Sequence, residues 1–530
     1  MNRPFSLAAA AVLCGLMISG CTTGSGMARL ENPSDIPGNG GGVAFPGVLT
    51  DPAEASRPEV RYIFHTHGMG MTDAEAVLID PVTVALQAAG YTRETNLAET
   101  PWIEAPTARR YEFKGEALSC EGGAALQKPC RYDDFGQYRI DRFLHADGKS
   151  RVVVYSYLWH EDLWRLQKPF LAHDLDGLKS GFAGWTSGSL SGVLKTSIVN
   201  EGLSDVAAYL GPAGKPLRDG MSSAVCIMLR EAAGRPVTTA DHNSTISLGP
   251  SECLGEADDE ALKRRNARIS FISHSLGSRM LFDVIGAGDS NTKAPSEGLK
   301  ALSRATDTFF MAANQLALLG VSRGVTPVEA QIQGLSKEAQ MIEDFIRQDC
   351  PGNAPSFLTV GCRVQSMAAS KEIEQNILKD CPAELLAPEM ARCRETSAAA
   401  TRAKFRAALQ KGRTLWVVGF FDPGDVLGYS LMGGRTGPAP ADIRFISVLH
   451  RNTPQILGLG SNPLAAHDNE LALETLPPPG VGQSRPHQAP PYNRERPTRV
   501  FKSPNAKDMI LCGAKSDPAG RLTPDLCPPR

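Results

Sequence analysis

One stretch near the middle of the chain has the pattern of a strand, a tight turn and a helix in direct succession. Residues 269–272 (ISFI) are mostly β-branched and aromatic, which is typical of a buried strand. Small and polar residues follow at 273–277 (SHSLG), and the apolar spacing over 278–285 predicts a helix. We therefore expect Ser275 at the apex of a sharp turn, with its hydroxyl lifted away from the sheet.

This pattern resembles the nucleophile elbow of the α/β-hydrolase superfamily, which is usually written G-x-S-x-G. Ser273 stands in place of the first glycine, and Gly277 matches the second. The resemblance implies an α/β-hydrolase fold over 60–474, with a mostly parallel central sheet flanked by helices. It also implies that Ser275 is a catalytic nucleophile. The alternative is a serine-rich turn without chemistry.

A second match to this superfamily follows the short strand predicted at 60–64. Residues 65–71 (HTHGMGM) contain an H-G-x-G run that resembles the oxyanion loop of α/β-hydrolases. Glycines in such a loop let the backbone approach a substrate and turn an N–H group toward it. The resemblance implies that the backbone N–H groups of Met69 and Leu276 form the oxyanion hole.

Three further residues are candidates to line or support this site. His67 and Gly68 belong to the H-G-x-G run, and His160 follows the strand predicted at 151–158. The alternative for His160 is a polar residue at the start of a helix. His65 and His67 could instead bind a metal, but no H-E-x-x-H motif or carboxylate cluster accompanies them. The sequence therefore predicts no metal and no cofactor.

The candidate acid lies in a turn that follows the strand predicted at 414–419. Asp422 and Asp425 both occur there, within the run FFDPGDVLGY. The G-D-V-L-G-Y part is similar to the acid loop of several lipase-like hydrolases, which favours Asp425 as the triad acid. Asp422 remains the alternative, and the aspartate without a catalytic role would cap the turn.

The candidate base follows the last predicted strand, 442–449. His450 stands at the end of this strand, and His467 lies in the next loop, where the general base of the superfamily belongs. We favour His467 on that resemblance. The order Ser275, Asp425, His467 is the serine, acid, histidine order of α/β-hydrolases.

Three functional hypotheses remain for this chain. The first is a carboxylic-ester hydrolase, similar to lipases and esterases, that acts through an acyl-enzyme intermediate. The second is an amidase or peptidase with the same triad, and the third is a non-catalytic interaction protein of the cell envelope. The fold alone does not choose among them. The intact set of Ser275, Asp425 and His467 favours an enzyme over a binding protein.

The start of the chain predicts export and a lipid anchor. Arg3 precedes an apolar run over 5–18 that is too short to span a bilayer. The letters I-S-G-C ending at Cys21 resemble the lipobox of bacterial lipoproteins, so 1–20 is expected to be a signal peptide and Cys21 to be lipidated. An ordinary signal peptide is the alternative. By the same resemblance, Thr22 favours the outer membrane of the bacterial cell envelope, facing the periplasm.

The net charge of the chain bears on which classes of partner are expected. The formal net charge of the 530 residues is −2, which gives no reason to expect nucleic acid. The expected partners are a small-molecule or lipid ester substrate and the membrane that holds the lipid on Cys21. Oligomeric state is left open by the sequence.

Four segments are expected to lie outside the catalytic sheet. Residues 21–59 are rich in Gly, Pro and Ser and predict a flexible tether. A cap is expected over about 165–215, and a disulfide-stapled helical insertion over about 322–410. The proline-rich residues 475–530 predict a tail that extends over the surface.

The cysteines predict a set of local disulfides. Of the 12 cysteines, Cys14 and Cys21 belong to the signal and the lipid site, which leaves an even number in an oxidising compartment. Because the others fall as neighbours in the sequence, we expect five short-range bridges and no free thiol. The expected pairs are Cys120–Cys130, Cys226–Cys253, Cys350–Cys362, Cys381–Cys393 and Cys512–Cys527.

Overall fold

The structure is a computed structural model of the whole chain. It describes residues 28–31, 42–50, 60–69, 80–94, 100–113, 130–164, 166–167, 171, 203–235, 260–262, 264–286, 305–313, 379–382, 385–410, 415–421, 430–431, 443–450 and 504–525. None of the helices within these ranges is both long and apolar enough to cross a membrane.

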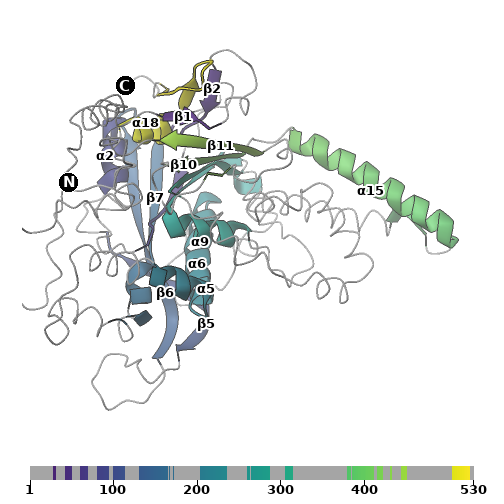
Figure 1. Cartoon of the computed structure of the whole chain (residues 1–530), viewed down its shortest axis with the longest axis horizontal. Helices are drawn as coiled ribbons and strands as arrows, with labels where there is room; N and C mark the ends of the chain where they lie inside the picture. Colours follow the sequence, from purple (N-terminus) through teal and green to yellow (C-terminus); the bar gives the residue numbers. More distant parts are fainter. Residues whose placement is uncertain are drawn as a thin grey trace, which may run out of the picture.

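One large sheet forms the centre of the molecule (Figure 1). Its strand order over the described residues is β1-β11-β10-β9-β8-β3-β7-β6-β4, and β5 pairs with β6 outside this row. The strands are β1 (Ala28–Leu30), β3 (Val60–Thr66), β4 (Tyr91–Arg93), β5 (Ile103–Phe113), β6 (Cys130–His145), β7 (Arg151–Leu158), β8 (Arg268–His274), β9 (Thr306–Ala312), β10 (Leu415–Phe421) and β11 (Ile443–His450).

The prediction of an α/β-hydrolase fold with a mostly parallel sheet is wrong, because this sheet is mixed. Neighbouring strands from β11 to β7 pair in parallel. In contrast, β1 pairs antiparallel with β11, and β4, β5 and β7 each pair antiparallel with β6. The turn at 146–150 joins β6 to β7, and so short a link can only return the chain antiparallel. In this turn the Asp147 carboxylate accepts hydrogen bonds from two backbone N–H groups, and Gly148 has a φ of +70°.

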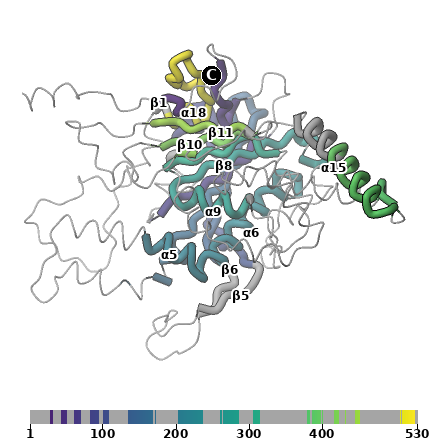
Figure 2. Tube along the Cα trace, turned by 45° about the vertical axis from the view of Figure 1, so that its right-hand side comes forward, coloured from purple at the N-terminus to yellow at the C-terminus, as the bar shows by residue number. Residues whose placement is uncertain are grey.

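Helices cover both faces of the sheet (Figure 2). Along β3, Tyr62 and Phe64 point into the core under α6 and α9, whereas Ile63 points into the core under α2 and α18. This alternation follows from the two-residue repeat of a strand. The helices are α2 (Asp80–Ala88), α6 (Gly214–Ala232), α9 (Ser275–Gly286) and α18 (Pro504–Cys512).

Two helices belong to the segments that the sequence predicted as a cap and an insertion. Helix α5 (Ser204–Leu210) is the main described part of the predicted cap, and it lies beside α6. Helix α15 (Ala387–Gln410) projects away from the sheet (Figure 1). The disulfide Cys381–Cys393, with Cα atoms 5.8 Å apart, ties the start of α15 to the preceding turn. This bridge confirms one of the predicted pairs.

The states of Cys226 and Cys512 bear on two more of the predicted pairs. Cys226 is a free, buried thiol within α6, so the predicted bridge to Cys253 and the prediction of no free thiol are wrong. It packs in the core that α6 and α9 share, where a cysteine behaves as a small apolar residue. Cys512 is disulfide-bonded, and its predicted partner Cys527 lies outside the described residues.

Segments near the two ends of the sequence add to the core. Strand β2 (Gly42–Phe45) pairs antiparallel with β12 (Ala514–Ser516), which pairs in turn with β13 (Leu522–Pro524). Phe45 is fully buried in the core under α18. The structure therefore differs here from the predicted tether and tail, because apolar residues of both segments gain burial by packing together.

Candidate active site

The junction between β8 and α9 is a sharp turn with a serine at its apex. Strand β8 ends at His274, and α9 begins at Ser275 without an intervening residue. Ser275 has a φ of +48°, in the left-handed region that costs a residue with a side chain about 1–2 kcal/mol. Such strain persists only where the surrounding structure holds it, and it is concentrated at functional sites. The expected strand, turn and helix are therefore present.

The two small residues that flank this serine have separate packing roles. The Ser273 hydroxyl lies 3.0 Å from the Ser278 hydroxyl and 3.3 Å from the Phe310 carbonyl oxygen, which joins β8 to both α9 and β9. A Cβ atom on Gly277 would come within 2.0 Å of the His67 carbonyl oxygen. The first position thus accepts a serine because its hydroxyl is satisfied, whereas the second has room only for glycine.

The loop after β3 lies directly against this turn. A Cβ atom on Gly68 would stand 2.7 Å from the Ser275 Cβ atom and 2.5 Å from His274 Nδ1. Glycine at this position lets the backbone of the loop reach the serine. The predicted oxyanion donors, the N–H groups of Met69 and Leu276, come from the residues that follow Gly68 and Ser275, so they belong to the two segments that meet here.

The His67 ring is buried between the carboxyl ends of β3 and β7. Its ring stacks on Trp159, with centroids 4.8 Å apart and planes 8° from parallel. Its Nδ1 lies 2.6 Å from the Gly68 carbonyl oxygen, and its Nε2 accepts a hydrogen bond of 3.1 Å from the Trp159 backbone N–H. Both ring nitrogens are therefore engaged, which argues against the alternative of a metal bound by His65 and His67.

The electrostatic surroundings keep the His67 ring neutral. Burial lowers the pKa of His67 well below its usual range, and the nearby His160 ring lowers this pKa further. The Trp159 indole N–H also donates a hydrogen bond of 3.3 Å to the His67 carbonyl oxygen. The loop is thus attached to the end of β7 by its side chain and by its backbone.

A histidine–carboxylate pair lies at the end of β7. Nδ1 of His160 is 3.3 Å from Oδ2 of Asp205, and the Gln167 side-chain amide donates a 2.9 Å hydrogen bond to the other carboxylate oxygen. Asp205 is fully buried. A carboxylate in this position orients the imidazole ring. No local pattern marks Asp205 as a partner, because it comes from α5, 45 residues beyond His160.

Helix α5 is also attached to the helix that carries the serine. The Tyr209 hydroxyl of α5 donates to the Asp283 carboxylate of α9, and Arg279 Nε donates to Asp283 at 3.0 Å. Burial and this carboxylate raise the pKa of the Tyr209 hydroxyl, so it remains a donor. The described part of the predicted cap is therefore held against the candidate site from two sides.

The carboxyl ends of three neighbouring strands hold most of the predicted site residues. Met69, Gly68 and His67 follow β3, Ser275 and Leu276 follow β8, and His160 follows β7. Four predicted residues lie outside the described residues: the acid Asp425, its alternative Asp422, the base His467 and the lipidation site Cys21. Their roles therefore stay predictions. The alternative base, His450, ends β11, and β9 and β10 separate it from the serine strand.

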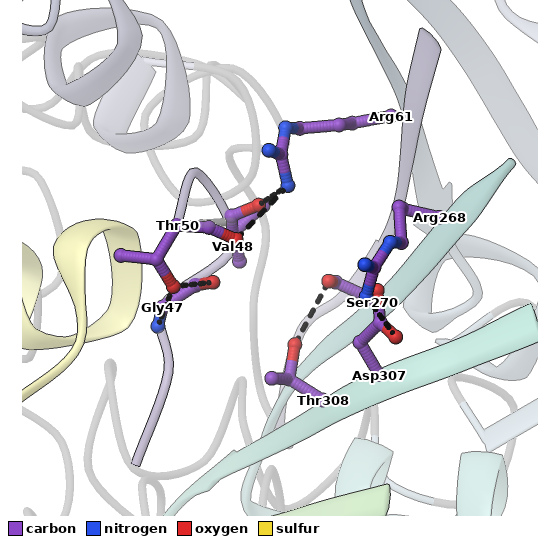
Figure 3. A network of polar contacts seen from close by, with 8 residues as sticks. All are labelled: Gly47, Val48, Thr50, Arg61, Arg268, Ser270, Asp307 and Thr308. Atoms are coloured by element: carbon purple, nitrogen blue, oxygen red, sulfur yellow. Dashed lines mark hydrogen bonds and ion pairs between the residues drawn. The ribbon is translucent and has the colours of Figure 1, made fainter. Parts of the chain in front are cut away.

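A second buried polar cluster occupies the opposite, amino-terminal ends of β3, β8 and β9 (Figure 3). Arg61 of β3 donates to the backbone carbonyl of Val48 at 2.8 Å and to that of Thr50 at 3.4 Å. The Thr50 hydroxyl in turn exchanges hydrogen bonds with the backbone of Gly47. This part of the cluster holds the segment before β3 against the sheet.

The other half of this cluster joins β8 to β9. Arg268 Nη1 lies 2.6 Å from Oδ1 of Asp307, and the Thr308 hydroxyl donates to the Ser270 hydroxyl at 2.8 Å (Figure 3). Both contacts run between paired strands, which points to a structural role. The candidate site is therefore the carboxyl edge of the sheet.

No protein-family model, curated protein or solved structure matches this chain. A functional assignment therefore depends on the geometry of the site itself.

Proposed function

We propose that this protein is a serine hydrolase that cleaves carboxylic esters with Ser275 as its nucleophile. One observation carries the proposal: Ser275 adopts a φ of +48° at an immediate strand-to-helix junction, and the backbone of Gly68 lies against it. A serine in a strained turn beside two backbone N–H donors is suited to attack a carbonyl group and to stabilise the charge that develops on its oxygen.

The proposed reaction has two halves. In the first, Ser275 Oγ attacks the ester carbonyl carbon, the hydroxyl proton passes to a general base, and the carbonyl oxygen becomes an oxyanion that the Met69 and Leu276 N–H groups stabilise. The C–O bond to the alcohol then breaks, and the alcohol leaves with that proton. In the second half, water attacks the acyl-serine in the same way and releases the acid.

The base and the acid of the proposal are those predicted from the sequence. His467 takes the serine proton, and Asp425 orients and stabilises the imidazolium that forms. His160, held by Asp205 at the end of β7, is proposed to line the substrate site.

The substrate is proposed to be a small-molecule or lipid ester. We further propose that acyl chains on Cys21 anchor the enzyme in the bacterial cell envelope, at the periplasmic side of the outer membrane. Two or more acyl chains give stable anchoring, whereas a single chain gives only marginal binding.

Labelling with a fluorophosphonate probe tests the proposal, together with hydrolysis of p-nitrophenyl esters. We expect Ser275→Ala to fold normally, to lose all labelling and to lose hydrolysis by about 10⁴-fold or more. Ser270→Ala is the matched control, because it removes a buried hydroxyl from the other end of the same strand and should leave labelling intact. Wild-type labelling or hydrolysis by Ser275→Ala would exclude the proposed nucleophile.

A further inference from the structure

The His67 side chain controls the direction of one peptide group. Its Nε2 accepts the Trp159 backbone N–H and therefore carries no proton itself, so the proton of the neutral ring is on Nδ1. This Nδ1–H then donates to the Gly68 carbonyl oxygen at 2.6 Å. The tautomer of His67 is thus set by the backbone of the neighbouring strand end, and it fixes where the Gly68 carbonyl points.

The orientation of that carbonyl determines the orientation of the next N–H group. In a trans peptide the C=O and N–H bonds point in opposite directions, and the described chain contains no cis peptide bond. The Gly68 carbonyl faces the His67 ring, which lies against Trp159 on the β7 side of β3. The Met69 N–H therefore faces the β8 side, where Ser275 lies.

We propose that His67 is a positioning residue that holds the Gly68–Met69 peptide in the orientation that presents the Met69 N–H to the oxyanion. This inference rests on the proposed function, because it assigns a task within the same reaction. Gly68 has no side chain to restrict its rotation, so without the histidine the peptide can turn its carbonyl toward the serine instead. A carbonyl oxygen there would repel the developing negative charge.

The surroundings of His67 favour this role over simple packing. The ring is held face to face with the Trp159 indole, and the His67 carbonyl receives the indole N–H while lying against Gly277. The histidine therefore cannot shift without disturbing the strand ends on both of its sides. Burial also keeps the ring neutral at the pH of an assay, which preserves the single proton on Nδ1.

Two substitutions of His67 separate its hydrogen bond from its volume. His67→Phe keeps an aromatic ring against Trp159 but removes both ring nitrogens. His67→Asn keeps an N–H donor at about the position of Nδ1 and loses part of the ring. We expect His67→Phe to lower kcat by about 10²-fold with little change in KM, as the loss of one oxyanion donor does, and His67→Asn to recover much of that loss.

A pair of matched substrates provides a readout that packing alone would not move. A thionoester places sulfur, a weaker hydrogen-bond acceptor, where the ester places oxygen. The ratio of kcat/KM for an ester to that for its thionoester therefore reports the strength of the donors. We expect this ratio to fall by at least 10-fold in His67→Phe and to stay near the wild-type value in His67→Asn. Mere loss of folded protein would lower both rates equally.

The outcomes keep this inference distinct from the proposed function. A crystal structure of His67→Phe should show the 68–69 peptide rotated, and this result does not depend on any activity. An unrotated peptide, or a wild-type substrate ratio in a folded His67→Phe, overturns the positioning role while Ser275 remains the nucleophile. If His67→Phe does not fold, His67→Asn provides the test. An ester-to-thionoester ratio of kcat/KM at least 10-fold below the wild-type value in His67→Asn would then overturn the positioning role. Hydrolysis by Ser275→Ala overturns the proposed function and with it the task assigned to His67, whereas the hold of His67 on the 68–69 peptide is still decided by the structure of His67→Phe.

Discussion

The two ends of the central strands carry buried polar clusters of opposite kinds. At the amino-terminal ends, Arg268 is paired with the Asp307 carboxylate, and Arg61 donates to backbone carbonyls. At the carboxyl ends the chain instead holds a neutral histidine, His67, and a strained serine, Ser275. The first cluster satisfies buried charges, with a paired strand for Arg268 and with backbone carbonyls before β3 for Arg61, whereas the second places polar groups beside a tight turn.

Backbone strain also differs between the two ends of the strands. Asn266, just before β8, has a φ of +46°, but asparagine adopts this conformation readily. Ser275 and Ala313, which follow β8 and β9, have φ values of +48° and +47°, where a serine or an alanine is strained. Buried polarity alone is thus a poor guide to a site in this molecule. Polarity combined with backbone strain is a better one, because local rules are broken mainly where function requires it.

The largest expected effect is a loss of hydrolytic activity when Gly68, at the carboxyl edge of the sheet, is replaced by alanine. In Gly68→Ala the new Cβ atom would lie 2.5 Å from His274 Nδ1 and 2.7 Å from the Ser275 Cβ atom, so the loop has to shift by about 1 Å. A displacement of that size costs about 10²-fold in rate. We expect this loss in kcat/KM for p-nitrophenyl esters. Gly42→Ala is the control, because nothing lies within 4 Å of its new Cβ atom. Equal activity of the two variants would contradict the proposed contact.

The amino-terminal cluster should respond in stability rather than in activity. Asp307→Asn leaves the buried Arg268 guanidinium without its carboxylate, and breaking such a pair costs about 3 kcal/mol, or about 10²-fold in the unfolding equilibrium. We expect a lower urea midpoint and an unchanged kcat per folded molecule. The control, Arg521→Gln, breaks an exposed pair with Asp517 and should change stability by less than about 1 kcal/mol. A loss of kcat in folded Asp307→Asn would erase the contrast between the two edges.

The smallest expected effect is a loss of folding stability at acidic pH. The pKa of His67 is lowered in the folded state, so below about pH 6.5 the unfolded chain binds a proton that the folded chain does not. The stability that the neutral ring contributes is present above pH 6.5 and is lost as the pH falls toward the lowered pKa. The loss is at most about 1.4 kcal/mol per pH unit. His67→Asn does not titrate, so its urea midpoint should fall less between pH 6.5 and 5 than that of the wild type. Parallel curves would show that His67 is not the acid-sensitive group.

The turn at Ser275 and the loop at Gly68 could be predicted from the sequence, because each depends on a short run of neighbouring residues. The strand, turn and helix around Ser275 depend on residues within about ten positions of it, and the glycine of the H-G-x-G run marks a close approach of the backbone. Asp205 could not be found in this way. Its contact with His160 depends on how α5 lies against the end of β7, which no local pattern encodes.

The direction of the strands is the part of the fold that the apolar pattern does not predict. The run over 151–158 predicts a buried strand, which β7 confirms, but an apolar run does not encode the orientation of its neighbours. The sequence signal for direction is Asp147-Gly148, a turn pair that predicts a hairpin and hence an antiparallel partner. Similarly, proximity in the sequence predicts a bridge for Cys226, whereas its buried position on α6 keeps it a free thiol.

The pairing of β2 with β12 has a consequence for how the molecule acquires its structure. Ala514 pairs with Phe45, about 470 positions away, and Met509 and Ile510 cover the same face of the sheet as Ile272 and Phe310. The entropic cost of closing so long a loop grows only slowly with its length, but such contacts form late. While the chain is being made, this apolar face stays open until residues 504–525 arrive. That interval is when a nascent chain is most exposed to aggregation and proteolysis, and it ends only with the last pairing.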